Sequence, residues 1–169
     1  HDPLTGLANR ERFLEQFQRT IAHAERHGRK VAILFVDLDG FKDVNDTHGH
    51  ARGDVLLQAV AGRLQECVRR SDMIARLGGD EFVVLLSGRQ DILHVRDAIR
   101  AQLRAPVSLG DACVVSVFAS VGGAMYPRDG QTTRQLLETA DAEMYRDKAR
   151  NHLRSGRQRR APAQPTLFD

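Results

Sequence analysis

One stretch, residues 76–82, constrains the fold more than any other part of the chain. Two glycines, Gly78 and Gly79, stand there between largely apolar runs at residues 73–77 and 82–86. A Gly-Gly pair between two such runs is typical of a β-hairpin, because glycine adopts the left-handed backbone that tight turns require. We therefore predict two paired strands with Gly78 and Gly79 as the connector.

Two acids, Asp80 and Glu81, follow the glycines directly and so lie at the tip of the predicted hairpin. Glycines without a side chain let the backbone approach a bulky ligand closely. Adjacent carboxylates supply the hard oxygen ligands that Mg²⁺ prefers. The stretch therefore predicts a site for a phosphate ester together with a divalent metal ion.

Apolar periodicity predicts helices on both sides of this hairpin. They run from Asn9 to Gly28, over residues 55–68, from Asp91 to Pro106, and onward from a capping box of Thr132 and Gln135. Residues 31–36 form an unbroken apolar run, which indicates a central strand covered on both faces. Because a hairpin separates helices and no regular strand–helix alternation is present, the order favours an α+β sheet over a doubly wound one.

The net charge of +3 does not indicate a nucleic-acid partner. Six Lys and Arg lie between Lys148 and Arg160, where no Asp or Glu occurs, so the rest of the chain is slightly acidic. With 5% aromatic residues and no Trp, side chains that stack on bases are also scarce. We expect no nucleic-acid binding.

The two cysteines, Cys67 and Cys113, are too few and too isolated for a disulfide scaffold or a zinc site, and we expect both to be small core residues. No segment reaches the roughly 20 apolar residues that span a bilayer, and no signal peptide opens the sequence. We expect a cytoplasmic domain without membrane contact, either free or as the cytoplasmic portion of a larger, membrane-anchored protein.

The hairpin pentapeptide reads GGDEF, and here the sequence resembles the GGDEF family of diguanylate cyclases. Further motifs follow in the family's order at residues 2–10, 37–42, 45–46, 49–54 and 140–148. The resemblance implies an α+β fold with a palm-like central sheet that contains antiparallel strands, flanked by helices and similar to nucleotide cyclase catalytic domains. It implies a domain over residues 1–153, and the Arg- and Pro-rich composition of residues 154–169 predicts an extended, mobile tail.

The resemblance implies that two GTP are condensed into cyclic di-GMP and two pyrophosphates, with Mg²⁺ or Mn²⁺ as cofactor. Asp37 and Asp80 are the implied metal ligands, assisted by the Leu38 carbonyl. Glu81 is either a further ligand or helps to remove the hydroxyl proton. Asp37 also ends a buried strand, where open sheets place ligands, although such an acid can instead cap the next turn.

Guanine recognition requires an acceptor for its N1 and N2 donors and a donor towards O6 or N7. Asn45 and Asp54 stand where the family places these contacts. Spacing alone leaves open that Asn45 is a turn residue and that Asp54 is a helix cap.

Phosphate contacts are implied for Lys42, for the backbone of Gly40 and Phe41, and for Lys148, with Gly78 and Gly79 leaving room for the nucleotide. A solvated surface lysine is the alternative for Lys42. The family's last helix ends at the lysine and is followed by Gly-Arg-Asn, whereas this chain has Asn151 and His152 where the glycine and arginine are expected. Arg150 or Arg154 is a possible substitute for the missing arginine.

Arg69 and Asp72 form an R-x-x-D motif at the family's inhibitory-site position, and Arg100 is a further candidate for that site. An arginine can pair bidentately with a guanine edge or a phosphate, so bound product would restrain the domain. The alternative for Arg69 is compensation of a helix dipole at a helix C-terminus.

Each domain binds one GTP by this interpretation, so catalysis requires a homodimer. Because the sequence begins directly on its first motif, we expect an upstream sensory domain outside it. The second hypothesis is a catalytically weak domain that acts as a cyclic di-GMP or GTP receptor, in keeping with the altered residues after Lys148. A third is a GTP-binding regulator of a phosphodiesterase domain.

Overall fold

The computed structural model describes residues 1–88 and 91–158. Within that part the helices are α1 (Arg10–His27), α2 (Phe41–His48), α3 (His50–Glu66), α4 (Ile92–Arg104) and α5 (Thr133–Gln158). The strands are β1 (Val31–Asp39), β2 (Met73–Gly78), β3 (Glu81–Ser87), β4 (Val107–Ser108), β5 (Val114–Val115) and β6 (Phe118–Tyr126). No helix among these residues is both long and apolar enough to cross a membrane.

Four strands form one antiparallel sheet in the order β2-β3-β1-β6. The first eight residues of β1 are buried, which confirms the predicted central strand. The strand reaches Asp39 rather than ending at Val36, and it pairs Asp37 with Glu81 of β3. One of the predicted metal ligands therefore stands within the sheet, beside the hairpin.

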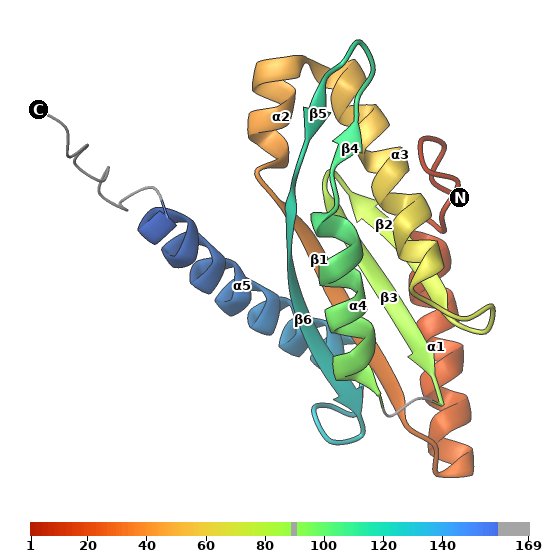
Figure 1. Ribbon diagram of the computed structural model, residues 1–169. Helices are drawn as coiled ribbons and strands as arrows, with labels where there is room; N and C mark the ends of the chain where they lie inside the picture. Colours follow the sequence, from red (N-terminus) through yellow and green to blue (C-terminus); the bar gives the residue numbers. More distant parts are fainter. Residues whose placement is uncertain (89–90, 159–169) are drawn as a thin grey trace, which may run out of the picture.

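Helices cover both faces of this sheet (Figure 1), which explains why β1 is apolar without alternation. Leu34 and Val36 belong to the core beneath α3 and α4, whereas Ile33 and Phe35 belong to the core beneath α1 and α5. The α+β class with an antiparallel sheet flanked by helices is confirmed.

The outer edge of β6 is closed by carboxylates. Asp147 accepts a hydrogen bond from the Val121 N–H (2.9 Å), Glu143 accepts one from the Gly123 N–H, and Asp129 accepts one from the Met125 N–H (2.8 Å). Glu143 and Asp147 belong to α5, and Asp129 to the loop before it. An edge strand leaves alternate N–H groups without strand partners, and these acids satisfy them.

Helix α5 lies directly against β6 at Gly122. A Cβ on this glycine would stand 2.1 Å from both the Ala140 carbonyl oxygen and the Met144 amide nitrogen. Only a residue without a side chain permits this approach. The glycine thus sets how closely the helix, with its functional residues, lies on the sheet.

Two helix boundaries differ from the prediction. Helix α3 begins at His50, five residues before the predicted start, because Gly49 rather than Asp54 is its N-cap. Helix α5 continues to Gln158, so residues 154–158 are helical and not an extended tail. The rest of the predicted tail, residues 159–169, lies outside the described residues.

Candidate functional site

The hairpin turns one residue later than predicted. Gly79 and Asp80 connect the two strands, and Gly78 is the last residue of β2. Positive φ angles of 147° at Gly78 and 51° at Gly79 explain why glycine stands at both positions. The side chain of Asp80 therefore lies in the turn itself.

An ion pair braces this turn. Arg76 donates from Nε to the Gly79 carbonyl (3.0 Å) and from Nη1 to Asp2 (3.1 Å), and both side chains are largely buried. Asp2 also accepts from the hydroxyl of Thr5 (2.6 Å). Sequence analysis assigned no role to Arg76 or Asp2, although Arg76 lies in the hairpin stretch 76–82 and Asp2 in the motif at residues 2–10.

Asp37, Asp80 and Glu81 form one acidic cluster. Asp37 is 7% exposed and faces Glu81 across the sheet, while the Leu38 N–H donates to the Asp80 carbonyl (3.3 Å). Lys148 from α5 donates to Oδ2 of Asp37 (3.1 Å). The other oxygen, Oδ1, is buried and has no hydrogen-bond partner among the described residues. The structure thus joins these predicted residues.

Burial and neighbouring charge perturb the pKa values of Asp80, Glu81 and Lys148. Burial, followed by the negative charge of Asp37, raises the pKa values of Asp80 and Glu81 above their usual range. Burial lowers the pKa of Lys148, but its hydrogen bond to Asp37 and the charge of Asp37 outweigh this and raise it. Concentrated negative charge of this kind favours binding of a cation.

The cluster suits a Mg²⁺ or Mn²⁺ ion held only partly by protein. The described residues contain no group of three or more His, Cys, Asp or Glu side chains arranged as metal ligands. The unpartnered oxygen of Asp37 and the Asp80 carboxylate supply two anionic ligands, and Mg²⁺ commonly takes one or two carboxylates and completes its shell with water and substrate phosphate. These residues therefore fit the ion.

Asp80→Asn is expected to stabilise the cation-free protein at neutral pH. Because the folded-state pKa of Asp80 is raised, its contribution to stability is greatest below the ordinary value of 3.8 and is lost as pH rises through the folded pKa. Asparagine does not ionise and avoids that loss. In thermal unfolding with EDTA, Tm of the variant should exceed that of the wild type at about pH 7, with the difference closing towards about pH 4. An equal or lower Tm at neutral pH would contradict the raised pKa.

Asn45, one of the two residues predicted to recognise guanine, lies against Gly53 of α3. A Cβ on Gly53 would lie 1.8 Å from Oδ1 of Asn45, so the glycine makes room for the amide. This Oδ1 is buried without a hydrogen-bond partner among the described residues, and such an unsatisfied polar atom is unusual in a protein interior. Asp54 is exposed on α3, one residue after Gly53, and is not that helix's cap.

The predicted phosphate contacts lie on α2 and α5. Lys42 is exposed in the first turn of α2, which begins after Gly40 with its φ of 83°. Lys148 is partly exposed and already pairs with Asp37. The Phe41 ring is half-buried. A Cβ placed on Gly53 would lie 3.5 Å from this ring.

Asn151 has a structural partner that sequence analysis missed. Its side chain donates to Asp39 and to Ser120 (both 3.2 Å), and the Ser120 hydroxyl donates to Asp39 (2.7 Å). Burial raises the pKa of Asp39, opposed by these hydrogen bonds. The residue that departs from the family pattern thus fastens α5 to the end of β1, three residues beyond Lys148. The sequence feature that could have indicated this role is Asp39, which lies within the motif at residues 37–42.

Arg69 and Asp72 lie together after α3. The Arg69 N–H donates to Oδ2 of Asp72 (3.0 Å), and the Asp72 N–H donates to the Arg69 carbonyl (3.0 Å). Arg100 instead binds Asp147 of α5 (2.7 Å). The turn therefore brings the R-x-x-D residues together, whereas Arg100 joins a different set of side chains at β6.

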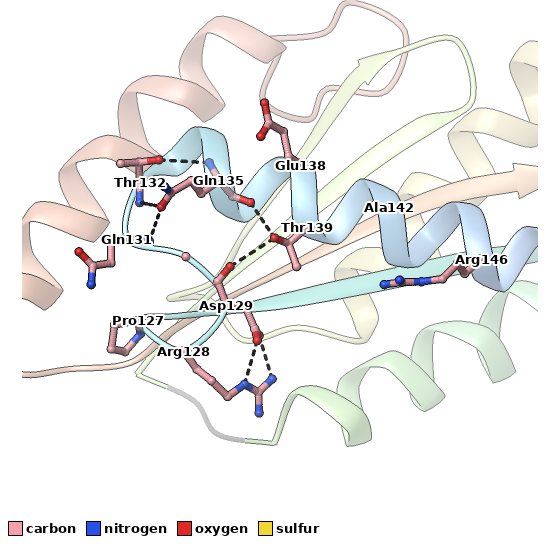
Figure 2. A pocket seen from close by; sticks show the side chains of 11 residues that line it. Pro127, Arg128, Asp129, Gln131, Thr132, Gln135, Glu138, Thr139, Ala142 and Arg146 are labelled. Atoms are coloured by element: carbon pink, nitrogen blue, oxygen red, sulfur yellow. Dashed lines mark hydrogen bonds and ion pairs between the residues drawn. The ribbon is translucent and has the colours of Figure 1, made fainter.

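A hollow of about 840 Å³ lies at the β6–α5 loop, away from the acidic cluster (Figure 2). Hydrogen bonds within the loop and helix maintain it: Thr132 caps Gln135 (3.1 Å), and Thr139 donates to the Asp129 carbonyl (3.2 Å). Thr132 and Gln135 confirm the predicted capping box. No functional role was predicted for the residues that line this hollow. We assign their hydrogen bonds to shaping the loop.

The structure thus combines an antiparallel sheet flanked by helices with acids near the end of β1 and in the hairpin turn, as expected for the family that the sequence resembles. The family described as diguanylate cyclase, GGDEF domain, matches residues 1–154. The diguanylate cyclase TpbB of Pseudomonas aeruginosa is 43% identical over 148 residues, covering 86% of this chain and 34% of TpbB. The chain belongs to the GGDEF family, and it spans about a third of that relative's length.

Solved structures agree with this assignment. The GGDEF domain of TpbB (YfiN) matches with a TM-score of 0.86 at 42% identity, covering 89% of each chain. The coiled coil and GGDEF domain of DgcB from Caulobacter crescentus, solved in complex with c-di-GMP, matches with a TM-score of 0.80 at 28% identity, covering 88% of this chain and 80% of that chain. The predicted family is thereby confirmed.

Proposed function

We propose that this domain condenses two GTP into cyclic di-GMP with release of two pyrophosphates. The observation that carries the proposal is the acidic cluster, in which a buried, unpartnered Asp37 oxygen adjoins two carboxylates whose pKa values are raised. In each step a 3′-hydroxyl attacks the α-phosphate of the other GTP, the bond to pyrophosphate breaks, and the hydroxyl proton is removed. The diguanylate cyclase activity named for TpbB supports the same reaction here.

The chain's own residues chiefly position and neutralise the reactants. Asn45 and Asp54 bind the guanine edge, and Lys42 and Lys148 bind phosphate oxygens. Lys148 exchanges its contact with Asp37 for phosphate when the nucleotide enters. A Mg²⁺ or Mn²⁺ ion held by Asp37, Asp80 and the Leu38 carbonyl would polarise the phosphoryl group and lower the pKa of the attacking hydroxyl. Glu81 either adds a ligand or accepts the proton.

Two copies of the domain are needed, because each binds one GTP and the product joins both. We propose a symmetric homodimer in which the acidic clusters face each other across the two bound nucleotides. An upstream sensory domain would control how often two copies meet. TpbB, of which this chain matches 34%, is a longer protein, which is consistent with such control.

The decisive test is product formation by a dimerised protein. The chain is fused to a constitutive leucine zipper, incubated with GTP and Mg²⁺, and the nucleotides are separated by chromatography. We expect cyclic di-GMP and pyrophosphate, with specific activity that rises with protein concentration for the unfused chain and is nearly constant for the fusion. Absence of cyclic di-GMP from the fusion at every concentration would overturn the cyclase proposal.

A receptor is the second candidate function, favoured by Lys148, which is paired with Asp37, and by the departure at Asn151 and His152. In that case cyclic di-GMP would bind at Arg69 and Asp72 without turnover. The DgcB complex with c-di-GMP supports binding of this ligand by a related domain. The same assay separates the two, because a receptor binds the dinucleotide but forms none.

Arg69→Ala is expected to relieve product inhibition. Loss of one bidentate arginine contact weakens recognition by about 1–3 kcal/mol, so the cyclic di-GMP concentration that halves the activity should rise by about fivefold to a hundredfold. The measurement is the initial rate at increasing cyclic di-GMP. Arg70→Ala, at the exposed neighbouring position, is the matched control and should leave the inhibition curve in place. Unchanged inhibition in Arg69→Ala would refute the assignment of the R-x-x-D site.

A further inference from the structure

Five arginines line a hollow of about 200 Å³ at the free edge of β6. Three of them come from α4 and two from α5, which flank β6 in Figure 1. We call this hollow the arginine pocket, and its arginines are Arg96, Arg100, Arg104, Arg150 and Arg154. Residues from two helices thus converge on one place, which sequence order alone does not reveal.

The acids in contact with these arginines are fewer than the arginines. Asp147 binds Arg100 (2.7 Å) and lies 3.9 Å from Arg150, while it also accepts from the backbone of β6. Asp97 lies 3.4 Å from Arg96 and 3.7 Å from Arg100, and its side chain is 66% exposed. Within the described part of the chain, Asp147 and Asp97 are thus the acids that pair with these five arginines. Like charges gathered in this way repel one another unless an anion joins them, and guanidinium groups bind phosphate oxygens bidentately.

An exposed aromatic ring adjoins the arginines. Phe118 is 46% exposed, and the guanidinium of Arg104 lies 5.6 Å from the centroid of its ring. A second hollow of about 430 Å³ shares Phe118, Arg104 and Arg154 with the arginine pocket, and the carboxylate of Asp39 also lines it. Aromatic faces and arginine planes both stack on bases, and this combination is typical of nucleotide sites.

We propose that the arginine pocket binds a phosphorylated purine nucleoside, with its phosphate on the guanidinium groups and its base on Phe118. The two connected hollows are large enough for a nucleotide, since ligand pockets commonly have about 300–1,000 Å³. The site is separate from Arg69 and Asp72, and it does not require that the acidic cluster turn over GTP. Arg100 is thereby assigned to this pocket through its contact with Asp147.

The sequence contains no Trp, so Phe118→Trp places a single fluorescent reporter at the proposed base site. The variant is titrated in EDTA with GMP, cyclic di-GMP, guanosine and pyrophosphate. We expect saturable quenching by GMP or cyclic di-GMP, at least tenfold weaker binding of guanosine, and competition by pyrophosphate without quenching of its own. The two nucleotide arms distinguish a mononucleotide from a cyclic dinucleotide as the ligand.

Substitutions then locate the binding. Arg150→Ala combined with Arg154→Ala should raise Kd at least tenfold in the Phe118→Trp protein, whereas Arg146→Ala on the same helix should leave it unchanged. Calorimetry on the chain with Phe118 intact, with and without the double substitution, covers the case in which Trp itself blocks the site. Two results would overturn the proposal. The first is quenching that does not saturate, together with calorimetric binding that the double substitution leaves unchanged. The second is equal binding of pyrophosphate and nucleotide without quenching. Neither result depends on cyclase activity.

Discussion

Asp37→Asn should lower cyclic di-GMP formation by about 10³-fold or more while leaving the fold intact. Asp37 is buried, accepts from Lys148 and presents an unpartnered oxygen to the predicted cation site. Asparagine keeps the volume but removes the negative charge that would hold the ion, and loss of such electrostatic stabilisation commonly costs about 10²–10³ in rate for a single neutral donor. A charged metal ligand should matter at least as much. The measurement is the initial rate of the zipper-dimerised protein under saturating GTP and Mg²⁺.

Asp43→Asn is the control for that experiment, because Asp43 is an exposed acid in the first turn of α2. It changes the same charge near the same strand end and should alter the rate by less than about twofold. Both variants should retain the circular dichroism spectrum and cooperative unfolding of the wild type. A folded Asp37→Asn protein with wild-type turnover would remove Asp37 from the reaction.

Gly122→Ala should destabilise the domain and displace α5 from the sheet. The new methyl group would meet two backbone atoms of α5 at 2.1 Å, and backbone cannot rotate away as a side chain can. Overpacking commonly costs about 1–3 kcal/mol, and relief here requires that α5 move off the sheet. Because Lys148 and Asn151 belong to that helix, product formation should fall together with the free energy of unfolding in urea.

Gly62→Ala is the matched control, since Gly62 lies in α3 and a Cβ there has no neighbour within 4 Å. Replacement of a helical glycine by alanine at an open position should stabilise the protein by about 0.5–1 kcal/mol. The two variants carry the same chemical change with opposite expected signs. If Gly122→Ala were as stable as the wild type, the close contact between α5 and β6 would be wrong.

The sequence predicts those features that depend on local chemistry. The unbroken apolar run of β1 specifies a strand covered on both faces, and Thr132 with Gln135 specifies the start of α5. The motif order also places Asp37, Asp80 and Glu81 in one cluster, because the antiparallel register pairs Asp37 with Glu81. Where a residue's partner is close in sequence or set by a strand register, its position follows from pattern.

Contacts between distant elements do not follow from pattern in the same way. Nothing in the periodicity of α4 states that Arg100 turns towards Asp147 of α5, and its assignment to the inhibitory site stays a prediction. Both hairpin glycines have positive φ, so both match the pattern of a turn, but Gly78 still belongs to β2. The turn therefore lies one residue later than the sequence predicts. Asn151 stands where the family has a glycine, and its hydrogen bonds to Asp39 and Ser120 depend on the whole packing of α5.

The carboxylates along β6 also bear on which changes in chain length the domain can tolerate. Each of three carboxylates, those of Asp129, Glu143 and Asp147, accepts a hydrogen bond from a particular N–H of β6. These contacts fix the number of residues between the loop and Lys148. Deletion of one exposed helical residue, such as Ala142, would turn everything after it by about 100° and shift it by about 1.5 Å along the axis. Lys148 would then miss Asp37 even though every functional residue was still present. We therefore expect length to be as strictly set in this segment as residue identity is in the hairpin.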